Sequence, residues 1–419
     1  MHFKITIRTL LFIFLISLFQ ISFAQKTEKT NKQPRLGSED QTENRESVDD
    51  SVKVSVFDLL IIKPYFDFKD KVYKKTGLRF DFDYNSLYMS SNSKMGDRNA
   101  AGGVFRFYGA WDLVGRKSGN TGTFIYKVEH RHKYTEIPVI DLSMNMGNVG
   151  IFGVTFNNNH FRVTNMYWKQ KLVKGRLILL GGFFDATDFF DIYALGSPWA
   201  HFNNLNFTTG LSAAALPGDA YLGLTAGGWI TDHIYGIIGF GDQNSDPTMI
   251  FRGFETFFVE HEFFKHAEIG YTTAKEYVFL DNVHISVWHR DNDRSLGTGW
   301  GWGAVFSATK YINKKWLPFF KASYTEKGES LLEAAVSTGI GYQPKPDGHQ
   351  FGLGFSWGRP NADTFGPGLK DQYVVESFYR IQLSRRMAFT PGLMYIIDPA
   401  MNPDQNSIFL WSLRARIAL

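Results

Sequence analysis

Apolar and polar residues alternate along much of this chain. The alternation is clearest over the last thirteen residues, 407–419, where Phe409, Trp411 and Leu413 share one parity and Arg414 and Arg416 share the other. Successive side chains of a β-strand point to opposite faces of the sheet. A strand of about ten residues with one aromatic, apolar face and one charged face is typical of a wall between lipid and water. The segment therefore predicts a membrane-spanning strand.

Five further segments follow the same rule: 78–84, 105–113, 124–131, 351–357 and 373–382. A soluble β-sandwich also alternates, but its strands are commonly about five or six residues long and its polar face looks into open solvent. These segments are longer, their apolar face is unusually aromatic, and their polar face mixes charges of both signs with Gly. The pattern favours an all-β fold, a transmembrane antiparallel β-barrel with inward-folded external loops.

Short and long connections alternate between the expected strands. Tight turns are expected near 173–175, 231–233, 274–276, 312–314, 346–348 and 384–386. Longer connections are expected near 90–102, 133–158, 186–218, 241–263, 291–298, 326–330, 360–370 and 398–406. Outer-membrane barrels have short periplasmic turns and long external loops, so the alternation predicts about sixteen strands. Residues 207–215 fit either an additional strand or part of the third loop.

The beginning of the chain departs from this pattern. The basic start, apolar stretch and small-residue site of residues 1–24 indicate a cleaved secretory signal peptide. Residues 25–51 are strongly polar and are expected to be a disordered leader. Residues 52–75 are expected to be a periplasmic amphipathic segment, either a helix on the membrane or in the pore, or a solvated lead-in to the first strand. The barrel is expected to cover 76–419.

Composition narrows the classes of function. Aromatic residues make up 16% of the chain and Gly numbers 40, as expected of a barrel with aromatic girdles. The chain has no Cys, which excludes disulfides and thiolate metal sites, and its formal net charge of +4 does not suggest a nucleic-acid partner. His130 and His132 share an outward face without an evident third ligand, so no metal site is expected. The sequence lacks a nucleophile elbow, an HExxH motif and a Walker loop, so we expect neither an enzyme nor a cofactor.

Charged residues on the expected inner face supply the candidate site. A wide barrel leaves an aqueous channel that a long loop must narrow, and the third external connection carries Asp185, Asp188 and Asp191 among aromatic residues, followed by Trp199. Carboxylates bond sugar hydroxyls and aromatic rings cover sugar C–H faces, although each ring would equally serve to pack the loop against the wall. The complementary residues on the expected strands are Arg79, Arg106, Lys127, Glu129, Arg131, Arg162, Arg380, Arg414 and Arg416.

Two interpretations of these charges stay open. A row of Arg facing Asp and Glu creates a transverse field and a narrow eyelet, which favours polar neutral solutes. The same residues would also form a solvated network of salt bridges without selectivity. Because strand one is expected to close against the last strand, Arg414 and Arg416 are predicted to extend a basic arc that begins at Arg79.

Several motifs resemble the carbohydrate-selective porin (OprB) family. They are the run 100–135, NMYWKQ at 165–170, the run 181–199, DQNSDP at 242–247, TFGPGLKDQY at 364–373 and DPAMNPDQNSI at 398–408. The resemblance extends from about residue 76 to the end. It implies a sixteen-strand outer-membrane barrel that passes glucose or other small sugars by facilitated diffusion, narrowed by inward loops with Arg and Glu at the eyelet. It points to Arg79, Arg106, Glu129, Arg131 and the region of Asp185.

The resemblance also implies a bacterial outer-membrane location. The expected partners are small carbohydrate solutes, outer-membrane lipid and lipopolysaccharide, and the outer-membrane assembly machinery, with the chain acting as a monomer or homotrimer. Two other functions fit the same barrel: a general diffusion porin without sugar specificity, and a closed structural or adhesive barrel. The sequence departs from many barrel proteins in ending with Leu419 rather than Phe, and the barrel does not explain the polar leader before Val52.

Overall fold

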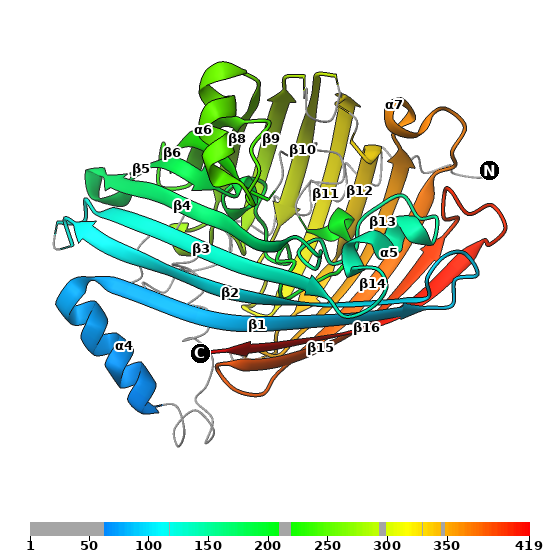
Figure 1. Ribbon diagram of the computed structural model, residues 1–419, viewed down its shortest axis with the longest axis horizontal. Coiled ribbons are helices and arrows are strands. Elements are labelled where there is room, and N and C mark those ends of the chain that lie inside the picture. Colours follow the sequence, from blue (N-terminus) through cyan, green and yellow to red (C-terminus); the bar gives the residue numbers. More distant parts are fainter. Residues whose placement is uncertain (1–62, 117, 209–218, 293–298, 329, 345–347) are drawn as a thin grey trace.

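The described part of the chain is built around a closed antiparallel barrel (Figure 1). The computed structural model describes residues 63–116, 118–208, 219–292, 299–328, 330–344 and 348–419. Sixteen strands follow one another around the barrel in sequence order, and β1 (Leu78–Ser91) closes against β16 (Ser407–Ala418). The predicted fold class and strand number are confirmed.

The other strands have regular antiparallel pairing with few register shifts. They are β2 (Asn99–Val114), β3 (Gly122–Lys133), β4 (His160–Leu172), β5 (Leu177–Phe184), β6 (Tyr221–Trp229), β7 (Ile234–Asp242), β8 (Phe263–Thr272), β9 (Asn282–Arg290), β10 (Gly301–Thr309), β11 (Trp316–Lys327), β12 (Leu332–Tyr342), β13 (Gln350–Pro360), β14 (Gln372–Gln382) and β15 (Met387–Ile397). Among the described residues, three short α-helices lie in the long connections: α5 (Leu142–Asn145), α6 (Ile250–Val259) and α7 (Ala362–Phe365).

The connections between these strands match the predicted alternation. Each long loop and each tight turn expected from the sequence falls between two strands, and a further short turn that the pattern does not indicate joins β2 to β3 near residues 115–121. β5 bonds directly to β6. Within the ambiguous segment 207–215, a 3₁₀ turn ends at Phe207, and residues 209–215 lie outside the described residues.

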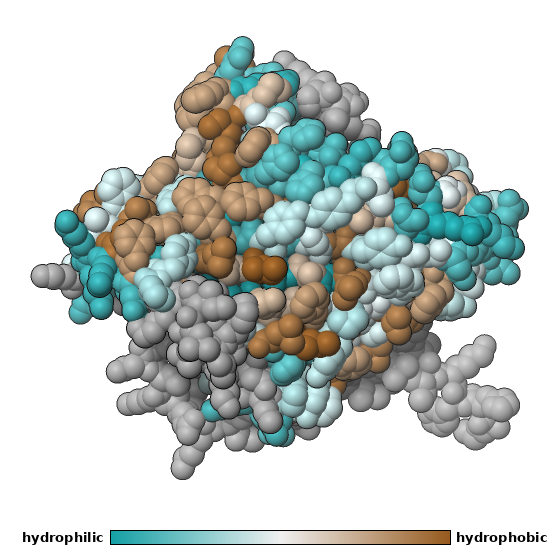
Figure 2. All heavy atoms as spheres, turned by 60° about the horizontal axis from the view of Figure 1, so that its bottom comes forward, coloured by the Kyte–Doolittle hydropathy of each residue, from teal (hydrophilic) through white to brown (hydrophobic). Residues whose placement is uncertain are grey.

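The burial of side chains follows the predicted parity. On β16, Phe409, Trp411 and Leu413 are 42–45% exposed, whereas Arg414 and Arg416 are 2% and 4% exposed. The charged residues therefore face the interior, where they find hydrogen-bonding partners, and the apolar residues face the side that lipid covers in a membrane barrel. Figure 2 shows brown and tan apolar side chains over much of the wall, with teal hydrophilic side chains at the right and upper middle of the view and a smaller group at its left edge.

Helix α4 (Lys63–Thr76) precedes β1 and lies at the same end of the barrel as the C-terminus (Figure 1). Lys69 of the helix forms an ion pair with the inward-facing Asp81, and the guanidinium of Arg386 lies 4.4 Å from the ring centre of Phe66. These contacts hold α4 against the periplasmic rim. No helix among the described residues is both long and apolar enough to cross a membrane.

The described residues begin inside the predicted amphipathic segment. Residues 63–75 of that segment are helical, as part of α4. Residues 52–62, the expected leader over 25–51 and the expected signal peptide over 1–24 lie outside the described residues.

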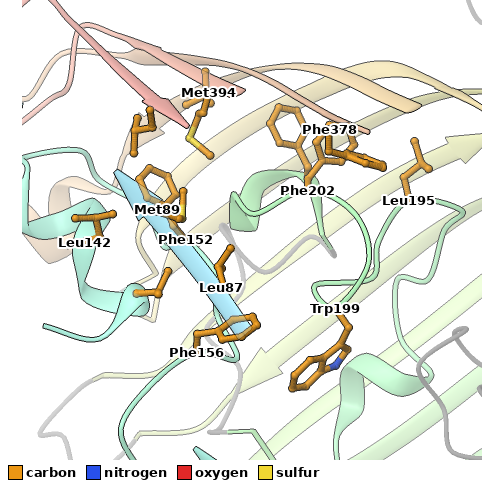
Figure 3. Close-up of a cluster of buried hydrophobic side chains, with 14 of the residues drawn as sticks. Leu87, Met89, Leu142, Phe152, Phe156, Leu195, Trp199, Phe202, Phe378 and Met394 are labelled. Carbon is orange, nitrogen blue, oxygen red and sulfur yellow. The ribbon is translucent and has the colours of Figure 1, made fainter. Parts of the chain in front are cut away.

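Two external loops fold into the barrel. Loop L2 (residues 134–159) and loop L3 (residues 185–220, described at 185–208 and 219–220) place apolar side chains against the inner wall, as predicted for inward-folded loops. Figure 3 shows the resulting cluster of Leu87, Met89, Leu142, Phe152, Phe156, Leu195, Trp199, Phe202, Phe378 and Met394. The wall leaves room for them at glycines: a Cβ on Gly354 would lie 2.7 Å from the Phe207 ring.

Candidate functional site: the lumen crossed by loop L3

Loop L3 is fastened to one side of the barrel through Asp191. The Asp191 carboxylate accepts two hydrogen bonds of 2.8 Å from Lys321 Nζ on β11, and His284 Nε2 on β9 lies 2.9 Å from its Oδ1. The backbone N–H of Asp191 donates to Glu268 Oε2 on β8 at 2.7 Å. Burial acts to raise the pKa of Asp191, but Lys321 and His284 outweigh it and hold that pKa below its ordinary value. Asp191 is fully buried, so it anchors the loop rather than facing open water.

A second anchor ties L3 to another part of the wall, on β14 and β16. Glu376 on β14 accepts hydrogen bonds from the backbone N–H groups of Asn203 at 2.6 Å and Asn204 at 3.0 Å. Arg414 on β16 donates to the carbonyl of His201 at 2.9 Å and to the side-chain oxygen of Asn203. L3 therefore spans the lumen from the β8–β11 wall to the β14–β16 wall.

A cluster of charges lies where the first and last strands meet. Asp83 on β1 accepts from Arg106 Nε at 2.7 Å and from Arg106 Nη2 at 2.5 Å, and it also accepts from Arg416 Nε at 3.1 Å. The guanidinium of Arg106 lies 3.9 Å from the ring centre of Trp199 in L3. The contact is close enough for a cation–π interaction and fixes the indole beside the β1–β16 seam.

Four of the predicted strand charges gather on β3 and β4. Arg131 Nη2 lies 2.5 Å from Glu129, and Asp219 of L3 pairs with Arg131 at 3.0 Å and with Arg162 at 2.6 Å. The buried Lys127 shares this inner face. Charges of both signs pair with one another here, and L3 supplies one of the carboxylates.

Asp185 and Asp188 stand at the start of L3, beside Lys127. Asp188 accepts from Asn165 Nδ2 at 3.1 Å, and Asp185 accepts from the backbone N–H of Thr187 at 2.9 Å. Burial and the neighbouring Asp188 carboxylate raise the pKa of Asp185 to about 7, and Lys127 opposes this only in part. The charge of Asp185 therefore changes near neutral pH.

One small hollow in the interior, with a volume of about 10 Å³, combines an aromatic ring with several cationic donors. Trp199, Arg380, Arg414 and Arg416 line it, together with three small or polar residues of L3 and β15. Arg380 lies on β14, and its Nε donates to Gln382 Oε1 at 2.9 Å. Guanidinium groups offer donors in a fixed planar arrangement, which suits the oxygen atoms of a polyhydroxylated solute.

The predicted site residues thus fall into separate groups. Trp199, Arg380, Arg414 and Arg416 share the hollow, and Arg106 joins them through Trp199 and Asp83. The others form the β3–β4 network and the start of L3: Lys127, Glu129, Arg131, Arg162, Asp185 and Asp188.

Two predicted residues lie elsewhere. Asp191 belongs to the anchor on β9 and β11, away from its two sequence neighbours in the Asp series. Arg79 lies at the periplasmic end of β1, where its Nη2 donates to Asp112 at 3.2 Å. In the β1–β16 register, Asn85 stands opposite Arg416 and Leu87 opposite Arg414, so Arg79 is well displaced from them along the strand. It does not begin the basic arc that contains them.

Four residues that organise the lumen were not among the predicted site residues. Asp83 and Glu376 occupy polar positions of the expected strands 78–84 and 373–382. The sequence therefore indicated that their carboxylates point into the barrel. Asp219 and Lys321 gave no comparable signal, because their partners come from chain segments 88 and 130 residues away.

Imidazole groups also meet on the outer wall. His130 and His132 have Nδ1 atoms 3.2 Å apart, and His132 Nε2 lies 2.9 Å from the Tyr84 hydroxyl. Within the described ranges, no group of three or more His, Asp or Glu side chains is placed to hold a metal ion.

Comparison with known proteins supports a porin. The profile of the family described as "Carbohydrate-selective porin, OprB family" matches residues 265–419, which contain the last two of the motifs quoted above, and the predicted resemblance is confirmed there. No curated protein sequence matches the chain. The fold and the matched family are those of a bacterial outer-membrane channel rather than an enzyme.

Several solved structures share the barrel. The high-pH structure of Pseudomonas putida OprB is 14% identical, with a TM-score of 0.68, over 85% of this chain and 97% of that chain. The low-pH structure of the same protein is 12% identical, with a TM-score of 0.52, over 88% and 100%. The outer-membrane channel DcaP of Acinetobacter baumannii is 9% identical, with a TM-score of 0.53, over 82% and 97%. At these identities the likeness concerns the fold.

Proposed function

Because the chain forms a sixteen-strand barrel whose residues 265–419 match the OprB family, we propose that it is a porin that passes small carbohydrates by passive, substrate-preferring diffusion. The observation that supports this most is the group of side chains at Trp199. The hollow that they enclose is about 10 Å³, enough for one water molecule, so a sugar would reach them only when L3 moves aside. There an indole meets the side chains of Arg380, Arg414 and Arg416 in a lumen crossed by L3. Sugars present hydroxyl oxygens to donors and C–H faces to aromatic rings, so this combination suits them better than it suits an ion or an apolar solute.

A general diffusion porin without sugar specificity is the first alternative. In that case the Arg131–Asp219–Arg162 pairs are a salt-bridge network that solutes pass without being retained. A closed structural or adhesive barrel is a second alternative, and the apolar cluster that L2 and L3 build in the lumen is the observation that favours it.

Conductance of the purified protein in a planar bilayer separates the three functions. A sugar-preferring porin gives channels whose current is reduced by glucose or a maltooligosaccharide and not by neutral polymers of matched size. Channels whose current is affected equally by sugars and by the neutral polymers indicate a general porin. The absence of any channel current indicates a closed barrel.

Arg380→Gln should weaken the block of the current by sugar. The substitution removes the guanidinium from the hollow and leaves an amide, which offers fewer donors. Loss of one hydrogen bond from a charged donor corresponds to about 1.5–3 kcal/mol, so sugar affinity measured from current noise should fall by roughly ten-fold or more. Arg359→Gln is the matched control, because Arg359 is half exposed on β13 and pairs with Asp371. Equal block in the two variants would remove Arg380 from the site.

The ion selectivity of the channel should depend on pH through Asp185. Below about pH 7 its carboxyl group is protonated and neutral, and above that pH it adds a negative charge near Asp188, Lys127 and Asp219. The preference for cations should therefore increase between pH 5.5 and 8.5, measured as a shift of reversal potential across a KCl gradient. Asp185→Asn should reduce that shift of reversal potential. A shift of full size in the variant would show that another group causes the pH dependence.

We also propose a route to the membrane that the composition of the N-terminal residues supports. The signal peptide over 1–24 would direct export and be cleaved, and the assembly machinery of the outer membrane would fold the barrel among lipid and lipopolysaccharide. The working form would be a monomer or a homotrimer. Mass spectrometry of the mature N-terminus and light scattering of the purified protein test these two points.

A further inference from the structure

Helix α6 packs on the outside of the barrel rather than in the lumen. It belongs to the external connection between β7 and β8, and Figure 1 shows it beside β6 and β8. Its buried Gly253 faces Phe183, whose ring a Cβ at Gly253 would approach to 2.5 Å. Phe183 has the same parity as Leu177 and Leu179, the exposed residues of β5. The helix therefore covers an outward-facing position.

Further contacts continue from α6 onto the outer wall. The ring of Phe257 lies 6.1 Å from that of Phe240 on β7 and 5.2 Å from that of Phe263 on β8. Phe240 is itself 37% exposed on the outer face. The buried Thr256 donates to Asp242 at the end of β7, and Ser245 donates to the same carboxylate at 2.9 Å. The helix is thus fixed to the wall by both rings and hydrogen bonds.

One side of α6 remains apolar and uncovered. Phe251, Phe254 and Phe258 are 82%, 43% and 65% exposed. Their spacing of three and four residues places them on one side of the helix, and Glu255 borders that side. Arg252 lies about 100° around the helix from Phe251, on a different side. Contiguous exposed aromatic residues mark an interaction surface, since isolated apolar side chains are common but grouped ones are not.

An apolar groove lies on the wall close to the helix. It has a volume of about 760 Å³ and is lined on strands β5 to β9 by outward residues that include Leu179, Leu224, Ile238, Phe240 and Val287. Phe240 belongs both to this groove and to the contact with α6. The uncovered side of α6 is therefore continuous with the surface that lipid covers in a membrane barrel.

We propose that α6 is an interfacial anchor whose Phe251, Phe254 and Phe258 side chains enter the acyl chains of the outer leaflet. An amphipathic helix lies in a membrane interface when its apolar side is buried in the acyl boundary and its polar side faces the headgroups. Arg252 supplies that polar side, and Glu255 lies at its border with the phenylalanines. The groove beside Phe240 then accepts acyl chains under the helix, so lipid rather than a second protein is the occupant.

The absence of Cys from the sequence allows a direct test by single-site spin labelling. Phe251→Cys and Phe258→Cys report on the uncovered side, Arg252→Cys reports on the polar side, and Leu413→Cys on the outer face of β16 serves as the lipid reference. Each labelled protein is placed in vesicles of phospholipid and lipopolysaccharide, after its folded state is checked by heat-dependent mobility in SDS gels. Accessibility to oxygen and to a water-soluble nickel complex is then measured.

We expect labels at 251 and 258 to match the label at 413, with high oxygen and low nickel accessibility. The label at 252 should have an oxygen-to-nickel ratio several-fold lower. High nickel accessibility at 251 and 258 would overturn the proposal by placing this side in water. Protection from both reagents, with spectral broadening that grows with the fraction of labelled protein, would overturn it in favour of a second copy of the chain.

Discussion

Asp191→Asn should increase the single-channel conductance and destabilise the folded protein. The amide keeps the shape of the side chain but removes the charge that Lys321 and His284 face, and all three side chains are at most 4% exposed. Breaking a buried ion pair by removing one partner costs about 3–5 kcal/mol. When L3 moves away from the wall, part of this free-energy cost is avoided. The loop should therefore spend more time away from β9 and β11. The expected result is a larger and noisier current with weaker sugar block.

Asp291→Asn provides the comparison for this experiment. Asp291 accepts from Lys265 at 2.6 Å, but that lysine is about half exposed and faces outward, and an exposed pair contributes roughly 0–1 kcal/mol. Conductance and stability in urea should therefore remain close to those of the parent. If Asp191→Asn behaves in the same way as this control, Asp191 does not hold L3 in place.

Asp83→Asn should weaken the closure of the barrel. Asp83 has no exposed side-chain surface and accepts from Arg106 on β2 and Arg416 on β16, so one carboxylate compensates two buried guanidinium groups on either side of the seam. Its loss leaves both cations without this partner and should reduce stability by about 3–5 kcal/mol. The measurement is the urea concentration at which half of the protein loses its heat-dependent mobility in SDS gels.

The surface pair Asp232–Lys275 is the reference for Asp83. The Asp232 side chain is 81% exposed, so Asp232→Asn should shift the midpoint very little. A small shift for Asp83→Asn as well would show that Arg106 and Arg416 find other acceptors in the lumen. Sugar block measured in the same variant then reports whether Trp199 still holds its position beside Arg106.

The barrel was predictable because lipid and water impose opposite demands on alternate residues. On β16 the exposed Phe409, Trp411 and Leu413 and the buried Arg414 and Arg416 follow the sequence parity without exception. The turn near residues 115–121 escaped the pattern, but the flanking segments 105–113 and 124–131 were recognised, so the strand number was unaffected. The alternation did not predict helix α6 either, because a pattern of period two identifies strands and leaves the segment only as part of a long loop.

The arrangement of the lumen was less predictable than the wall. Asp185, Asp188 and Asp191 recur every three residues, yet the first bonds Thr187 within its own turn, the second bonds Asn165, and the third crosses to Lys321. A loop has no fixed period that would assign its side chains to one face. Its conformation depends on partners distant in the sequence, and these become apparent only once the barrel has closed.

The two anchors of L3 have a consequence for the order of assembly. The loop contacts Glu376 and Arg414 near the end of the chain, whereas its Trp199 lies against Arg106 near the start of the barrel. All of these contacts can coexist only after β16 has met β1. A shift of β16 by one residue would turn Arg414 from the interior toward lipid, since neighbouring residues of a strand face opposite sides. The seated loop therefore favours the correct strand register, and acts as a check on the last step of barrel biogenesis.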